Sequence, residues 1–138
     1  MLTLTKWPNL RGAYSIGKQT AANLIATTNA FTSFKNWRKF ACYCGIAPFE
    51  YSSGSSIRKK TRISHLADKK MKSLLNMAAL TAKKPDAELK DYYDKKVKEG
   101  KNKMSVLNAI RCKIVSRAFA VIERNNPFVN ITKFKAVA

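Results

Sequence analysis

The chain has 138 residues, a length that suits one compact domain, and 46% of them are hydrophobic, as in a protein with a packed core. It carries 27 lysines and arginines against 8 aspartates and glutamates, which gives a net charge of +19. The positive side chains repel one another and oppose a compact state unless a polyanion neutralises them. Nucleic acid is therefore the expected partner, and a cytoplasmic, nucleoid-associated location is expected. No apolar run is long enough for a membrane span, and no secretory signal is recognisable.

An all-α fold is predicted, and its first helix follows a glycine turn. Residues 1–14 show no periodicity and predict an irregular leader. A helix is predicted from Gly17 to about Thr28, because apolar residues share one face of it: Ala21, Leu24 and Ile25. A glycine turn that opens a helix offers N–H groups and a positive dipole end to a phosphate, so Gly17 and Lys18 are candidate phosphate-binding residues of a helix-hairpin-helix-like part. An ordinary helix start is the alternative.

A second helix is predicted from Ser33, which can cap it, to Gly45. Its inward face holds apolar and aromatic residues at core spacing: Phe34, Trp37, Phe40 and Ala41. Its exposed cations are candidate nucleic-acid contacts: Lys35, Arg38 and Lys39. Stacking of Trp37 or Phe40 on bases is the alternative to a core position.

Residues 48–67 form a polar segment, which predicts a long Ser-Gly loop or a short hairpin. Ser52 and Ser53 precede Gly54, and four cations follow: Arg58, Lys59, Lys60 and Arg62. Small residues allow a phosphodiester to approach closely, and the cations would hold phosphates and stabilise charge that develops in phosphoryl transfer. A flexible linker with a solvated basic run is the alternative, and we interpret His65 as a surface or packing residue rather than a base.

Three further helices are predicted in the second half of the chain. Asp68 is expected to cap the first, which extends to Ala82, and a second covers residues 86–99 with Gly100 at its end. The last runs from about residue 104 to 124, and residues 131–138 predict a loose tail. The cations near the helix starts are further candidate nucleic-acid contacts: Lys69, Lys70, Lys101 and Lys103.

The acidic residues are concentrated in one helix. Glu50 is the only acid before Asp68, and five of the eight lie at positions 86–99, so that helix is expected to face away from the polyanion. Metal-dependent nucleases need converging carboxylates, and none are grouped in the basic half, so no metal site is predicted in this chain. The cysteines lack the spacing of a zinc site or a disulfide framework, and reduced thiols are expected: Cys42, Cys44 and Cys112.

Several sequence blocks, taken in order, resemble a known family. They are FTSFKNWRKF at 31–40, YCGIAP at 43–48, SGSS at 53–56, RIS at 62–64, LLNMAA at 74–79 and GKNKM at 100–104. Over residues 15–130 the chain resembles the C-terminal domain of the IS-one-ten (Piv/MooV-type, DEDD) family of bacterial insertion-sequence transposases. The ordered series is far more specific than any single block.

The resemblance implies an activity and its partners. Ser53, or alternatively Ser52, would attack a DNA phosphodiester and form a covalent phosphoserine link, assisted by Mg²⁺ and the four acids of a RuvC-like domain. A structured bridge RNA would select the DNA, and the chain would form oligomers with transposase chains. The RuvC-like acids are not among these residues, so we interpret the chain as a truncated form that is inactive alone. The alternative is a non-catalytic nucleic-acid-binding module or a regulator of full-length transposase.

Overall fold

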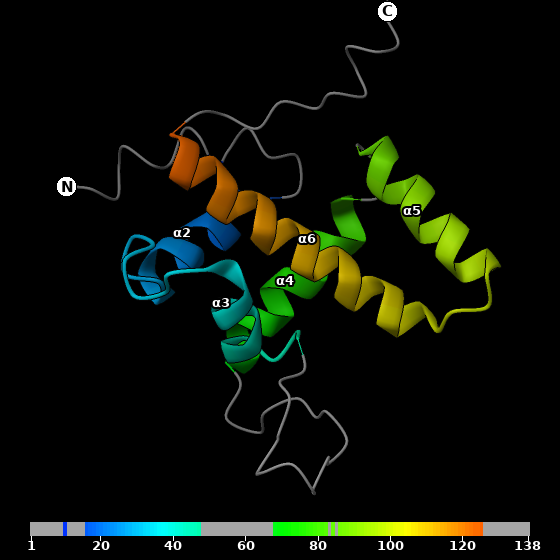
Figure 1. Ribbon diagram of the computed structural model, residues 1–138, viewed down its shortest axis with the longest axis horizontal. Coiled ribbons are helices and arrows are strands. Elements are labelled where there is room, and N and C mark those ends of the chain that lie inside the picture. Colours follow the sequence, from blue (N-terminus) through cyan, green and yellow to red (C-terminus); the bar gives the residue numbers. More distant parts are fainter. Residues whose placement is uncertain (1–9, 11–15, 48–67, 83, 85, 126–138) are drawn as a thin grey trace, which may run out of the picture.

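The computed structural model describes residues 10, 16–47, 68–82, 84 and 86–125. Within these residues the chain forms five helices and no strand (Figure 1), which confirms the predicted all-α fold. The helices are α2 (Lys18–Thr27), α3 (Trp37–Tyr43), α4 (Lys69–Ala82), α5 (Ala87–Lys98) and α6 (Lys103–Arg124). The predicted tail, the serine segment 48–67 and all of the predicted leader except Leu10 lie outside the described residues.

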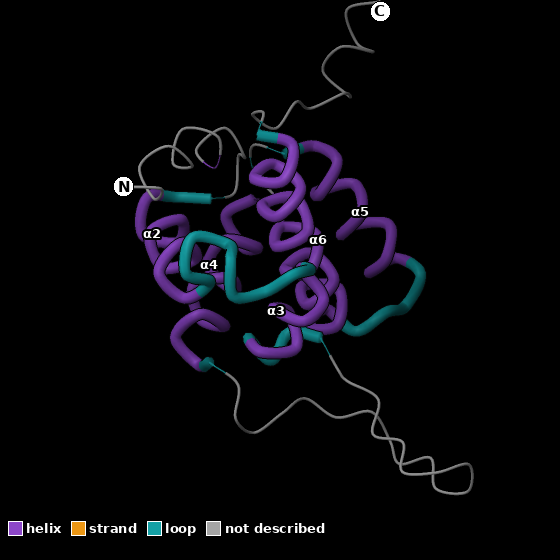
Figure 2. The backbone as a smooth tube through the Cα atoms, turned by 60° about the vertical axis from the view of Figure 1, so that its left-hand side comes forward, coloured by secondary structure: helices purple, strands orange, loops and turns teal. Residues whose placement is uncertain are grey.

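The longest helix, α6, is the centre of the arrangement. It packs against α3, α4 and α5, while α2 packs against α4. Figures 1 and 2 both place α2 and α5 on opposite sides of α6. The core draws fully buried side chains from every helix: Leu24, Phe40, Leu75, Leu89, Ile110 and Ile114. No helix in the described part of the chain combines the length and hydrophobicity that a membrane span requires.

Helix α2 begins and ends as the sequence predicts. Gly17 is its N-cap and Thr28 its C-cap, and the buried face includes the predicted residues Ala21, Leu24 and Ile25. The Thr28 hydroxyl donates to the Leu24 carbonyl at 2.6 Å and accepts from the Phe31 N–H at 2.9 Å. Because a hydroxyl with both a donor and an acceptor partner is satisfied without water, Thr28 is fully buried at this turn.

The predicted start of the second helix at Ser33 is wrong, and α3 begins four residues later at Trp37. Residues 29–31 adopt positive φ angles of 48°, 56° and 65°, and the Ser33 N–H donates back to the Thr28 carbonyl at 3.0 Å. Ser33 therefore closes the turn, and Asn36 caps α3 by accepting from the Lys39 N–H at 2.9 Å. Lys35, which we expected on the helix, precedes it.

Side-chain caps fix the starts of the last three helices. The Asp68 carboxylate accepts from the Met71 N–H at 3.0 Å, and the Asp86 carboxylate accepts from the Leu89 N–H at 3.2 Å. Asn102 caps α6 by accepting from the Met104 N–H at 2.8 Å. Such caps satisfy N–H groups that have no partner within the helix, so they define where each helix begins. The predicted cap Asp68 is confirmed, whereas Asp86, which was expected as the first residue of its helix, is instead the N-cap of α5.

Candidate nucleic-acid interface

The first three helices carry cations without acidic residues. No aspartate or glutamate occurs in α2, α3 or α4. All of the predicted contact residues that the structure describes are exposed: Gly17, Lys18, Lys35, Arg38, Lys39, Lys69, Lys70, Lys101 and Lys103. Exposed cations that are free of neighbouring carboxylates on their own helix can release counterions from a phosphate backbone, so these helices form the more basic part of the described surface.

A backbone hydrogen bond joins the two helices that precede and follow the serine segment in the chain. The Asp68 N–H donates to the Tyr43 carbonyl at 3.1 Å, which ties the end of α3 to the start of α4. Ala47 and Asp68 are the described residues that flank residues 48–67. The predicted residues within that segment lie outside the described residues: Ser52, Ser53, Arg58, Lys59, Lys60, Arg62 and His65.

Gly17 forms an open helix start. It is exposed, its φ is −75° and its ψ is 170°, and no side chain caps the N-terminus of α2. A Cβ built on Gly17 would meet no heavy atom within 4 Å, so neither the backbone angles nor crowding requires a glycine here. Gly17 supplies no capping hydrogen bond to the first N–H groups of α2, which is the arrangement in which a phosphate can serve as the partner.

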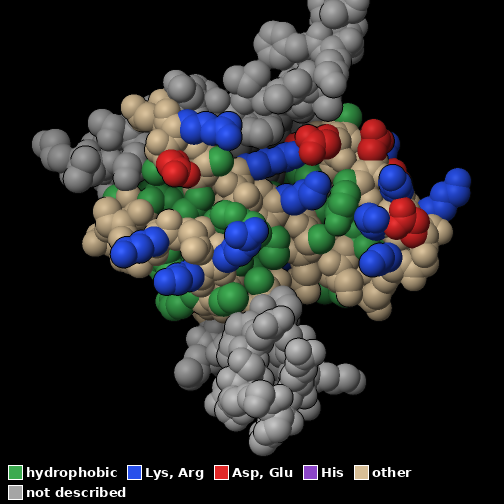
Figure 3. All heavy atoms as spheres, viewed as in Figure 1, with side chains coloured by type: hydrophobic (Ala, Val, Ile, Leu, Met, Phe, Trp, Pro, Cys, Tyr) green, Lys and Arg blue, Asp and Glu red, His purple; other side chains and the backbone are tan. Residues whose placement is uncertain are grey.

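The α5 side of α6 has a mixed charge. Helix α5 and its caps contain five acids and four lysines, and acidic side chains gather on this side of the face in Figure 3. Arg117 of α6 donates to the buried Asp86 carboxylate at 2.7 Å and forms an ion pair with Glu88 at 3.0 Å. The prediction that α5 faces away from a polyanion fits this pairing, because these carboxylates already neutralise a cation of the protein itself.

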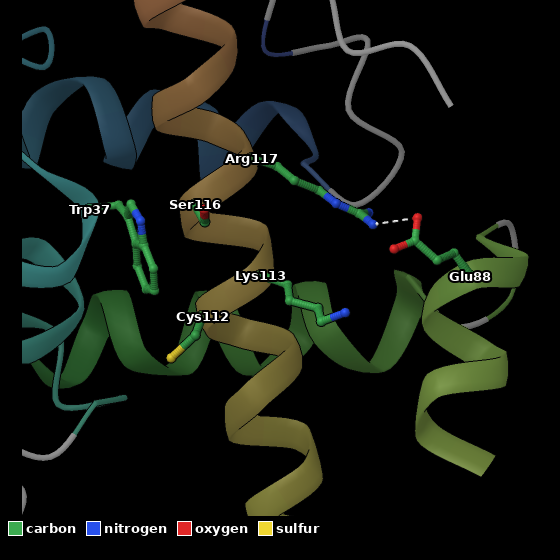
Figure 4. A pocket seen from close by; sticks show the side chains of 6 residues that line it. All are labelled: Trp37, Glu88, Cys112, Lys113, Ser116 and Arg117. Atoms are coloured by element: carbon green, nitrogen blue, oxygen red, sulfur yellow. Dashed lines mark ion pairs between the residues drawn. The ribbon is translucent and has the colours of Figure 1, made fainter. Parts of the chain in front are cut away.

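A cavity of about 280 Å³ lies between α3, α5 and α6 (Figure 4). Trp37 faces Cys112 and Ser116 across it, and Arg117 points toward Glu88. Burial raises the pKa of the Cys112 thiol, whose Sγ–H donates to the Ile46 carbonyl at 3.7 Å, so Cys112 is a poor nucleophile. The half-buried Trp37 and the fully buried Phe40 both belong to the core, as predicted.

A second cavity, between α4 and α6, contains a residue that the sequence analysis missed. Arg111 lies there with 3% of its surface exposed. It occupies the apolar face of α6, four residues after Leu107 and three before Ile114, both of which are buried. A cation at a core position of an amphipathic helix was the signal that could have identified it.

The described residues provide no ligand set for a divalent metal. No three histidine, cysteine, aspartate or glutamate side chains converge among residues 10, 16–47, 68–82, 84 and 86–125. The three thiols are free, and burial raises the pKa of Cys44 to about 12. Deprotonation is required for a thiol to bind a metal, so Cys44 does not fit such a role.

Comparisons with known proteins identify relatives of this chain. Residues 8–94, more than half of the chain, match the model of the transposase IS116/IS110/IS902 family. The chain is 32% identical over 114 residues to the pilin gene-inverting proteins of Moraxella lacunata and Moraxella bovis, which covers 82% of the chain and 35% of each relative. It is 29% identical over 115 residues to an uncharacterised 43.6 kDa protein of insertion element IS110 from Streptomyces coelicolor, covering 83% of the chain and 28% of that protein. The chain thus spans about a third of the length of these relatives.

Proposed function

The chain belongs to the IS116/IS110/IS902 family of transposases, and we propose that it is the DNA-binding C-terminal part of such an enzyme and carries the serine nucleophile. The observation that carries the proposal is the family match over residues 8–94, which includes α2, α3, α4 and the serine segment between α3 and α4. The pilin gene-inverting relatives support a role in DNA recombination.

The basic helices supply the binding energy for DNA in this proposal. Lysines and arginines on α3 and at the start of α4 neutralise backbone phosphates, and the counterions that leave the DNA drive association. The open start of α2 at Gly17 accepts a further phosphate, as in a helix-hairpin-helix module. The bond between the Tyr43 carbonyl and the Asp68 N–H supports the proposal, because it holds the end of α3 against the basic start of α4.

Ser53 performs the covalent step, with Ser52 as the neighbouring alternative. Its Oγ forms a bond to the phosphorus of a DNA phosphodiester while the bond from phosphorus to one deoxyribose oxygen breaks. The hydroxyl loses its proton and the departing oxygen takes one up. The phosphoserine link keeps the phosphodiester bond energy for rejoining. Cations of the segment, Arg58 among them, stabilise the negative charge that develops at the phosphate.

The metal chemistry of the family belongs to a domain outside these 138 residues. A RuvC-like domain would hold Mg²⁺ through its acids, and Mg²⁺ would polarise the phosphate when bound. The described residues do not offer such a ligand set. A bridge RNA that selects the DNA, assembly with other transposase chains and association with the nucleoid complete the proposal.

A covalent-capture assay tests the proposed function. The full chain is mixed with an intact partner transposase, bridge RNA, Mg²⁺ and nicked DNA of the element end. We expect a DNA adduct on this chain that survives denaturation, that Ser53→Ala abolishes and that Ser52→Ala retains. An adduct that persists in Ser53→Ala and disappears in Ser52→Ala would identify Ser52 as the nucleophile. Salt-dependent DNA binding without any adduct assigns the chain to the non-catalytic, regulatory function instead.

A further inference from the structure

The cavity between α4 and α6 has the composition of an anion-binding site. Its volume is about 310 Å³, and it lies at the start of α4, next to the Asp68 position where the serine segment ends. Its lining is rich in cations and hydrogen-bonding side chains: Lys69, Lys72, Ser73, Asn76, Met104, Asn108 and Arg111. No acidic residue is among them, so the lining attracts a negative charge.

Arg111 is buried in this lining with an unused donor. One of its terminal nitrogens donates to the Asn108 side-chain oxygen at 2.7 Å, and the other donates to that of Asn76. Its Nε–H is buried and has no acceptor among the described residues. A guanidinium has five N–H donors, and a buried donor without a partner loses its hydration without compensation. The side chain is therefore anchored by two amides, and its Nε–H remains a donor for a third partner.

The charge of Arg111 also lacks compensation. In the described part of the chain no carboxylate lies within ion-pair distance of it, and its two partners are neutral amides. Burial lowers the pKa of the guanidinium, which is the sign of a charge that has lost water without gaining a counter-ion. Lys69 and Lys72 add like charges to the same cavity. An anion that entered would relieve both the desolvation and the repulsion.

We propose that this cavity binds a backbone phosphate of nucleic acid through Arg111, with Lys69, Lys72 and Ser73 as further donors. The proposal rests on the proposed function, which makes nucleic acid the partner, and it adds a specific site. A phosphodiester matches the lining because it carries one delocalised charge and several acceptor oxygens, which suit a guanidinium and a hydroxyl. The site lies on the first turns of α4, which follow Asp68, the first described residue after the serine segment.

Inorganic phosphate tests the cavity independently of nucleic acid. Thermal unfolding of the full chain is followed in sodium phosphate and in sodium chloride of equal ionic strength, for the wild type, Arg111→Met and Arg111→Lys. We expect phosphate to raise the wild-type midpoint by roughly 2–4 °C, Arg111→Met to show no such rise, and Arg111→Lys to show part of it. Equal phosphate responses in the wild type and Arg111→Met would overturn the site.

DNA and RNA binding then identify the source of the phosphate. For Arg111→Met we expect roughly tenfold weaker binding and a slope of log affinity against log salt that is smaller by about 0.9, the value for one lost phosphate contact. The matched control is Arg124→Met, an exposed arginine of the same helix outside the cavity. If Arg111→Met leaves the salt slope unchanged for both DNA and RNA while the phosphate response still needs Arg111, the cavity binds free phosphate only. That result would overturn the proposal that it binds a nucleic-acid backbone. If the wild type binds no nucleic acid, the proposed function fails, while the phosphate response still decides whether the cavity is an anion site.

Discussion

Each side of α6 carries an arginine, half-buried on the α5 side and buried on the α4 side, and the two arginines differ in their partners. On the α5 side, Arg117 meets the buried carboxylate of Asp86 at 2.7 Å and the exposed carboxylate of Glu88 at 3.0 Å. On the α4 side, Arg111 is 3% exposed and bonds two asparagine amides. The first arrangement is an internal ion pair that holds α5 onto α6. The second leaves a buried positive charge for a partner outside the described residues.

Under the proposed function, this difference separates a structural side of the domain from a side that binds nucleic acid. Buried ion pairs that have good geometry are costly to break, because the remaining charge stays desolvated. A buried charge without a counter-ion destabilises the folded state and is relieved only when an anion arrives. The α4 side combines such a charge with helices that contain no acidic residues, whereas the acids of the α5 side are interspersed with lysines.

The largest effect is expected for Asp86→Ala. Asp86 is 1% exposed, caps α5 through the Leu89 N–H and pairs with Arg117, so its loss removes a cap and an ion-pair partner of a half-buried cation. We expect a loss of about 3 kcal/mol in the free energy of unfolding by urea. The control is Asp86→Asn, which retains the cap and should lose clearly less. Equal losses of unfolding free energy in the two variants would mean that the negative charge of Asp86 does not contribute to stability.

The next effect compares the two arginines directly. Arg117→Met leaves the buried Asp86 without its partner, and we expect a loss of about 2 kcal/mol. Arg111→Met removes an uncompensated charge and replaces it with an apolar chain, so the free energy of unfolding should stay within about 1 kcal/mol of the wild type. Urea denaturation without phosphate or nucleic acid measures both. A loss for Arg111→Met as large as that for Arg117→Met would contradict the contrast between the two sides.

Cys44 shows a third way to bury an ionisable group, which is to keep it uncharged. Burial raises its pKa from 9.0 to about 12, so above pH 9 the unfolded chain releases a proton that the folded chain retains. Stability is therefore unaffected below pH 9 and falls as the pH rises from 9 toward 12. Between pH 7 and pH 10 the wild type should lose about 1 kcal/mol more than Cys44→Ala, as measured by urea denaturation of both. An equal loss would mean that the Cys44 thiol ionises freely in the folded protein.

The sequence predicted local features well because their causes are local. The cap at Asp68 acts on an N–H group three residues away, so its spacing identified it, whereas Asp86 was expected within its helix and instead caps it. The start of α3 was missed because Thr28 and its buried hydroxyl, not the capping preference of Ser33, determine the preceding turn. The family blocks identified the transposase family, which the comparisons confirm.

The charge pairing on α6 depends on contacts that the sequence does not reveal. Asp86 and Arg117 are 31 positions apart, and Arg111 meets Asn76 across 35 positions. Whether a buried arginine finds a carboxylate or an amide depends on how α4, α5 and α6 pack, so neither the structural pair nor the unpaired charge could be predicted from composition. The serine segment and Ser53 lie outside the described residues and remain predictions.

The contrast between the two sides is tested most directly by removing equal charge from each and measuring the salt dependence of duplex DNA binding. The double variant Lys69→Gln/Lys70→Gln alters exposed lysines at the start of α4, and Lys95→Gln/Lys98→Gln alters exposed lysines of α5. We predict that the α4 variant binds more weakly and that its slope of log affinity against log salt is smaller by about 2, while the α5 variant keeps the wild-type slope. Equal changes in both variants would contradict the account, because DNA would then respond to the overall charge rather than to the α4 side.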